Sequence, residues 1–124
     1  MKKVYNKLVR DKMIDIYKHD VANEISASGY EVRYLNRQKT LEELKNKLLE
    51  EAQEVFDAYG KDPAHLKEEI ADLIEVIDAI LYHNDIKLEE VLTIRDAKKA
   101  KKGGFETGLY LESIDYFDDH DGKR

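Results

Sequence analysis

The chain has 124 residues, no cysteine, and a formal net charge of −6 from 21 basic and 27 acidic side chains. This length fits one domain with a single core. The acidic balance argues against a general nucleic-acid binder, because such a surface cannot neutralise a run of phosphates. Without cysteine the chain has no disulfide framework, thiol nucleophile or Cys-ligated zinc. No apolar run is long enough to span a membrane, so we expect a cytoplasmic protein with no membrane partner.

The first part of the chain predicts a helix over residues 11–28, which Gly29 ends. Residues 31–35 alternate between polar and apolar side chains, as a short β-strand does. Residues 108–112 are a candidate for a second flanking strand that pairs with the first. The fold class we expect is therefore mainly α, with short β-strands on its flanks.

The central part of the chain predicts two long helices. Thr40-Leu41-Glu42-Glu43 reads as a capping box, so we expect the first helix to begin at Thr40 and to end at Gly60. Asp62 and Pro63 are typical of a new helix start, and this second helix is expected to end near His83. The apolar face predicted for the first helix consists of Leu41, Leu44, Leu48, Ala52, Val55 and Tyr59. Two amphipathic helices with so short a break form an antiparallel hairpin.

Residues 88–102 predict a third amphipathic helix, followed by Gly103 and Gly104. Residues 115–124 are acidic and poor in apolar side chains, which favours a mobile tail. No long linker separates domains, so we expect a single domain over residues 1–114 and the tail after it.

The acidic side chains of the hairpin are its most informative feature. Glu51 and Glu54 lie one turn apart on the first helix, and Glu69 and Asp72 have the same spacing on the second. Two such pairs facing each other place four carboxylates in a small volume, which is costly without a cation. Mg²⁺ prefers oxygen ligands and shares its shell with substrate phosphates. The spacing therefore suggests a magnesium site for a polyphosphate, although acids at this spacing are also common on a solvated helix face.

Other metals fit the pattern less well. Di-iron sites in helical bundles use Glu-x-x-His, and none of the four histidines has that spacing. The histidines are scattered singly, which disfavours zinc. We assign no role to His65 or His83.

Three sequence blocks resemble one protein family. Glu50-Glu51-Ala52-Gln53-Glu54, then 14 residues, then Glu69-Ile70-Ala71-Asp72 is similar to the signature of the MazG-like, all-α nucleoside triphosphate pyrophosphohydrolases. Tyr5-Asn6-Lys7-Leu8-Val9-Arg10-Asp11-Lys12 resembles the opening of a subgroup of short MazG-like proteins, and Lys102-Gly103-Gly104-Phe105 resembles that subgroup's ending. The superfamily also includes the phosphoribosyl-ATP pyrophosphohydrolases.

The resemblance implies roles for individual residues. Glu51, Glu54, Glu69 and Asp72 are the implied ligands of Mg²⁺, for which Mn²⁺ is an expected substitute. Glu50 and Glu51 are the implied catalytic acids, and Glu50 would orient or deprotonate the attacking water. The basic and aromatic residues expected to complete the substrate site are Lys7, Arg10, Lys12, Lys98, Lys99, Lys102 and Phe105.

The first functional expectation is a Mg²⁺-dependent pyrophosphohydrolase that converts an NTP or dNTP to the monophosphate and pyrophosphate, a house-cleaning activity on the nucleotide pool. The near alternative is phosphoribosyl-ATP pyrophosphohydrolase of histidine biosynthesis. The alternative from another class is a helical interaction module whose acids are surface residues. A hairpin alone makes a thin core, so we expect a homodimer or homotetramer built on a four-helix bundle.

Overall fold

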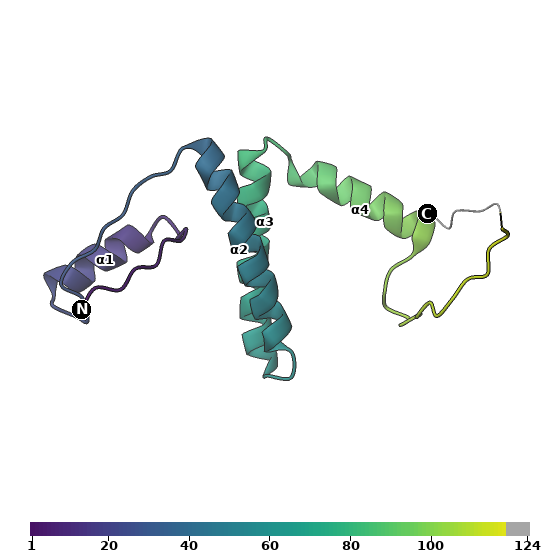
Figure 1. Ribbon diagram of the computed structural model, residues 1–124, viewed down its shortest axis with the longest axis horizontal. Helices are drawn as coiled ribbons and strands as arrows, with labels where there is room; N and C mark the ends of the chain where they lie inside the picture. Colours follow the sequence, from purple (N-terminus) through teal and green to yellow (C-terminus); the bar gives the residue numbers. More distant parts are fainter. Residues whose placement is uncertain (119–124) are drawn as a thin grey trace. The chain divides into compact units, whose positions relative to one another are not determined.

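The computed structural model describes residues 1–118, and within this range all regular secondary structure is helical. The helices are α1 (Met13–Ala22), α2 (Arg37–Ala58), α3 (Pro63–His83) and α4 (Leu88–Lys102), as Figure 1 shows. The chain divides into two compact units, Met1–Leu88 and a second that begins at Glu89. Across the described residues, no helix is both long and apolar enough to cross a membrane.

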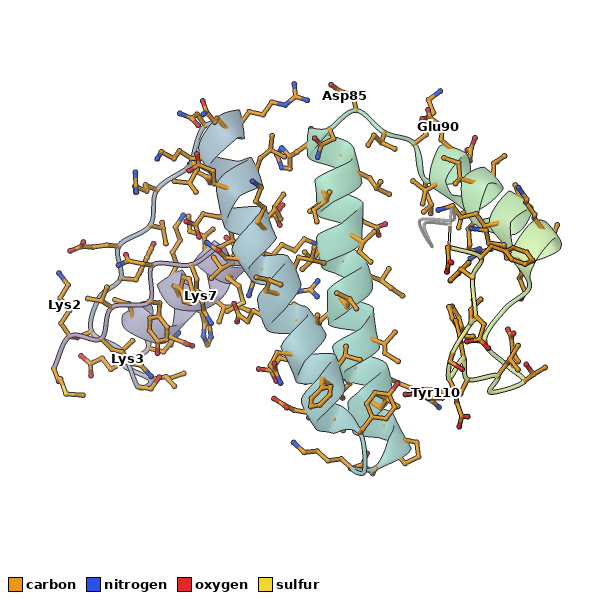
Figure 2. All side chains as sticks on the ribbon, turned by 45° about the vertical axis from the view of Figure 1, so that its right-hand side comes forward. Lys2, Lys3, Lys7, Asp85, Glu90 and Tyr110 are labelled. Carbon is orange, nitrogen blue, oxygen red and sulfur yellow. The ribbon has the colours of Figure 1, made fainter. Side chains whose placement is uncertain are left out.

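Helices α2 and α3 form the predicted antiparallel hairpin and lie side by side in both views (Figures 1 and 2). Asp62 caps α3 by accepting a hydrogen bond from the His65 amide at 2.9 Å, and Pro63 is the first helical residue, as expected. Gly60 supplies the positive φ of +85° that the turn between the helices requires.

Helix α2 begins about one turn earlier than its sequence indicates. The Asn36 side chain accepts from the Lys39 amide at 2.8 Å and is the true N-cap. Thr40, the expected first residue, lies inside the helix, where its hydroxyl donates to the Asn36 carbonyl oxygen at 2.8 Å. Asn and Thr side chains cap a helix equally well, each by accepting from the amide three residues later, so the local pattern alone did not distinguish the two starts.

The open end of the hairpin is closed by Arg37, the first residue of α2. Its Nε donates to the carbonyl oxygen of His83 at 2.9 Å, and its Nη2 pairs with Asp85 Oδ2 at 2.9 Å. Asp85 lies just past the end of α3 (Figure 2). The contact satisfies a carbonyl that the helix end leaves free.

The core lies in the seam between α2 and α3 and is small. The buried apolar residues of the described chain are Leu44, Ala58, Val76 and Leu81. The seam of α2 contains Glu51 and Ala58, whereas Ala52 and Tyr59, expected on this face, are exposed. The prediction failed there because two neighbouring faces of α2 both carry apolar side chains at helical spacing.

The second apolar face of the hairpin is exposed. On α2 it carries Leu49, Phe56 and Tyr59, each 72% exposed. On α3 it carries Ile70, Ile74 and Ile77, which are 40%, 53% and 37% exposed. At about 100° per residue, both sets lie roughly a quarter turn from the seam, and in an antiparallel pair of right-handed helices they fall on the same side.

Both predicted β-strands are wrong. Residues 31–35 and 108–112 have no strand structure, and α1 covers only Met13–Ala22 of the expected 11–28. Asn23 ends α1, and Glu24 and Ser26 then adopt positive φ values of 53° and 56°. A short alternating segment needs a partner strand to become a strand, and none lies beside either segment in the described chain.

Helix α4 matches its predicted bounds. Glu89 and Glu90 lie in its first turn and Lys99, Lys101 and Lys102 in its last, as the helix dipole favours. Gly103 ends it with a φ of +85°. Of the expected mobile tail, residues 119–124 lie outside the described range.

Candidate functional site

Three carboxylates converge in the seam of the hairpin. Glu51 from α2 and Glu69 and Asp72 from α3 each offer an oxygen, and these oxygens all lie within 4.8 Å of one another. We call these residues the acidic trio. The side chains of Glu51 and Glu69 are only 13% and 15% exposed, and that of Asp72 is 44% exposed. Positions that would hold core residues in an ordinary hairpin therefore carry acids.

The trio fits a hard divalent cation. Carboxylate oxygens are the ligands that Mg²⁺ prefers, and octahedral Mg²⁺ with bonds of about 2.1 Å places opposite ligands about 4.2 Å apart. The oxygens of the trio all lie within 4.8 Å of one another, so they are close enough to share one such ion. No other group of three or more acidic or histidine side chains comes together in this way in residues 1–118.

The burial of Glu51 has an electrostatic cost. Removal from water raises the pKa of its carboxyl above the ordinary 4.5, and the charges of Asp72 and Glu50 raise it further, while Lys47 acts in the opposite direction. A carboxylate kept in such surroundings gains most from a bound cation. This is the electrostatic pattern expected of a site built for function at the expense of stability.

Each acid of the trio has a basic neighbour. Lys47 Nζ lies 3.6 Å from Glu51 Oε1 and 3.6 Å from Glu50 Oε1. His65 Nε2 lies 3.7 Å from Glu69 Oε1. Sequence analysis gave neither Lys47 nor His65 a role. The signal was present, since both precede their acid by four residues on the same helix.

Arg10 supplies the third basic neighbour from outside the hairpin. Its Nη2 donates to Asp72 Oδ1 at 3.0 Å, although 62 residues separate the two in sequence. The contact brings the segment before α1 to the trio. Of the expected substrate residues, Arg10 is the one that the structure ties directly to the acids.

Glu50 and Glu54, the other acids of the motif, lie on α2 at the edge of the site. Both are exposed. Glu50 joins the site through its contact with Lys47. Glu54 is not part of the group within 4.8 Å, although its spacing from Glu51 directs it toward the same side of α2.

Lys7 and Lys12, the remaining basic residues of the first block, make no ion pair with the trio. The Lys7 ammonium instead lies 5.6 Å from the centre of the Tyr5 ring, and Lys12 precedes the first residue of α1. Lys2, Lys3 and Lys7 all belong to the N-terminal segment (Figure 2). Of the three basic residues in this block, Arg10 alone contacts an acid of the trio.

The second unit contains a groove of its own, about 750 Å³ in volume. Lys98, Lys99 and Phe105 line it, whereas Lys102 is not among its lining residues. Lys99 is paired with Glu106 at 3.4 Å, and Phe105 is 98% exposed. The remaining lining residues are Val91, Ile94, Arg95, Gly103, Gly104 and Glu106. The groove combines apolar and basic side chains, a composition suited to a phosphorylated organic molecule.

The chain is similar to phosphoribosyl-ATP pyrophosphohydrolases. The profile of that family matches residues 10–99, which include the acidic trio, Lys47, His65 and Arg10. A phosphoribosyl-ATP pyrophosphatase of Neisseria gonorrhoeae is 40% identical over 68 residues, which are 54% of this chain and 64% of the relative. The match thus spans less than two thirds of the relative's length.

No solved structure matches the chain. The expected resemblance to the MazG-like superfamily is confirmed, because the matched family is one of its branches. The profile covers more than half of the sequence and all of the hairpin. The protein therefore belongs to the phosphoribosyl-ATP pyrophosphohydrolase family.

Proposed function

We propose that this protein hydrolyses phosphoribosyl-ATP to phosphoribosyl-AMP and pyrophosphate, with Mg²⁺ held by Glu51, Glu69 and Asp72. The observation that carries the proposal is the half-buried acidic trio inside the stretch that the family profile matches. The similarity to the Neisseria enzyme supports the same substrate. Family and relative favour this activity over the NTP house-cleaning activity that ranked first in the sequence analysis.

Each residue of the site has its own role in the proposed reaction. Glu51, Glu69 and Asp72 would hold a divalent cation, which would supply positive charge to the triphosphate and lower the pKa of an attacking water. Glu50, exposed at the edge of the trio, accepts the proton of that water. Arg10, which donates to Asp72 of the trio, holds phosphate oxygens of the substrate. No nucleophilic side chain is required, since water attacks phosphorus directly.

The test is the release of pyrophosphate from phosphoribosyl-ATP, ATP and the common dNTPs, with Mg²⁺, with Mn²⁺, and with EDTA. We expect turnover of phosphoribosyl-ATP that needs the metal and that disappears in Glu51→Gln. Glu75→Gln, an exposed acid of α3 outside the trio, is the matched control and should keep wild-type turnover. Metal-independent release, or equal loss in both variants, would contradict the proposed site.

A second candidate is the pyrophosphohydrolysis of an ordinary NTP or dNTP. The blocks of residues 5–12 and 102–105 favour it, because they resemble short MazG-like proteins and lie largely outside the matched stretch. The same panel separates the two activities. Preference for one dNTP, with no turnover of phosphoribosyl-ATP, would establish the second candidate and reject the first.

A further inference from the structure

Of the three basic neighbours of the acidic trio, Arg10 makes the shortest contact, but its side chain is the most exposed and it comes from outside the hairpin. Lys47 touches two acids, belongs to the same helix as both, and its side chain is only 21% exposed. His65 likewise sits on the helix of its partner, and its side chain is 36% exposed. Arg10 makes one contact through one nitrogen, its side chain is 61% exposed, and it comes from an irregular segment.

A single exposed ion pair contributes little to stability, so Arg10 can leave Asp72 at small cost. A divalent cation on Asp72 makes that exchange favourable, because it brings two positive charges to the same carboxylate and repels the guanidinium. The Asp72 carboxylate, whose Oδ1 accepts from Arg10, then has two cations beside it.

We propose that Arg10 and the metal ion compete for Asp72, so that metal binding transfers the Arg10 guanidinium from Asp72 to the phosphates of the substrate. The inference rests on the metal site of the proposed function and adds an order of events to it. Arg10 neutralises the trio before the metal arrives and becomes a free phosphate ligand afterwards. The segment before α1 thus responds to the state of the metal site.

The rival role for Arg10 makes the opposite prediction. An arginine that only orients a ligating carboxylate strengthens metal binding, and its removal weakens it. An arginine that competes with the metal weakens binding, and its removal strengthens it. The sign of the change in metal affinity therefore separates competition from orientation.

The experiment is calorimetric titration of the full chain with Mn²⁺ alone and with Mg²⁺ alone, for wild type, Arg10→Gln, Arg10→Lys and Lys12→Gln. We expect Arg10→Gln to bind metal about two- to fivefold more tightly, the range that the loss of one exposed ion pair allows. Arg10→Lys keeps the charge and should stay close to wild type. Lys12→Gln removes the same charge two residues away, from a side chain with no ion pair to the trio, and should change the affinity less.

The second readout is the KM for phosphoribosyl-ATP at saturating metal. Transfer of Arg10 to the substrate predicts that Arg10→Gln raises KM while it lowers the metal Kd. Unchanged or weaker metal binding in Arg10→Gln would overturn the inference, as would tighter binding without any rise in KM. Equal circular dichroism spectra check that the variants are folded. If Arg10→Gln is not folded, metal affinity and KM are compared between wild type and Arg10→Lys instead.

The outcomes also distinguish the inference from the proposed function. Wild type that binds metal and shows the exchange, but hydrolyses no phosphoribosyl-ATP, would reject the proposed substrate and leave the competition at Asp72 standing; KM is then measured with the nucleotide that is turned over. Wild type that turns over phosphoribosyl-ATP, with Arg10→Gln binding metal no more tightly, would reject only the inference. Wild type that binds neither metal would reject both.

Discussion

Glu51 is the residue at which the demands of stability and chemistry conflict most directly. It occupies a seam position between Leu48 and Val55, which an ordinary hairpin would fill with an apolar side chain. Burial raises the pKa of its carboxyl above 4.5, with further contributions from Asp72 and Glu50 and partial relief from Lys47. A group whose pKa is raised in the folded state favours the folded form when it is protonated, and this contribution is lost as the pH rises through that pKa.

Removal of this charge is therefore expected to stabilise the protein in EDTA. Glu51→Gln should be more stable than wild type at pH 7, and the difference should shrink as the pH falls toward 4.5, where wild-type Glu51 is protonated as well. Urea unfolding at pH 7 and pH 5 measures the effect. Glu54→Gln, an exposed acid outside the trio, is the control and should show a smaller difference. A Glu51→Gln protein less stable than wild type at pH 7 would contradict this account.

Glu69→Gln provides an independent test at the same scale. The substitution removes a carboxylate ligand of the metal, so turnover should disappear. Unfolding in EDTA should be unchanged or require more urea, because one repelling carboxylate is gone. Wild type should gain about 2.7 kcal/mol of stability at a metal concentration of 100 times Kd, and Glu69→Gln should gain far less. A marked drop in the melting temperature of Glu69→Gln without metal would show that Glu69 is structural.

Glu50 should behave differently from the trio. Glu50 is an exposed acid that we propose accepts the proton of the attacking water. Glu50→Gln is therefore expected to lower kcat by about 10²- to 10⁴-fold. Metal affinity, measured by calorimetry, should remain close to that of wild type because Glu50 is not part of the trio. Loss of metal binding together with kcat would instead place Glu50 among the ligands.

At the scale of the helix, the start of α2 makes a sharp prediction. Asn36→Ala removes the acceptor of the Lys39 amide and should cost about 1 kcal/mol of unfolding free energy. Thr40→Ala removes a hydroxyl that donates within the helix and should cost less, because alanine is a better helix former. Urea unfolding of the two variants compares them directly. A larger loss in Thr40→Ala would mean that the helix begins where the capping box predicted.

The elements that sequence analysis predicted correctly are those whose signals are local. Asp62 and Pro63 mark the start of α3, and Gly103 marks the end of α4, whatever the rest of the chain does. The prediction of strands at residues 31–35 and 108–112 was wrong because a strand depends on a neighbouring strand, which alternation within a short segment does not predict. The same distinction holds for the basic neighbours of the acids. The contacts of Lys47 and His65 are predictable from helical spacing, whereas the contact of Arg10 with Asp72 depends on how the segment before α1 packs against the hairpin.

At the scale of the molecule, the hairpin carries two different long faces. Glu50, Glu54 and Asp72 follow one side of the seam, and the exposed apolar side chains follow the other. Four buried residues are a small core for a hairpin of this length. The apolar face therefore has much to gain from burial, at roughly 25 cal/mol per Å² of apolar surface.

We predict a homo-oligomer that assembles through this face, because two hairpins packed through it would form a four-helix bundle with the acidic sites on its outside. Phe56→Asp places a charge in the middle of the α2 part of the face and should dissociate the oligomer. Asn46→Asp adds the same charge on the same helix, on the side that faces away from α3 and about a quarter turn from the middle of the apolar face, and should disturb assembly less. Sedimentation velocity at micromolar concentration measures both. A wild-type monomer, or equal sedimentation of the two variants and wild type, would mean that the face is covered in some other way.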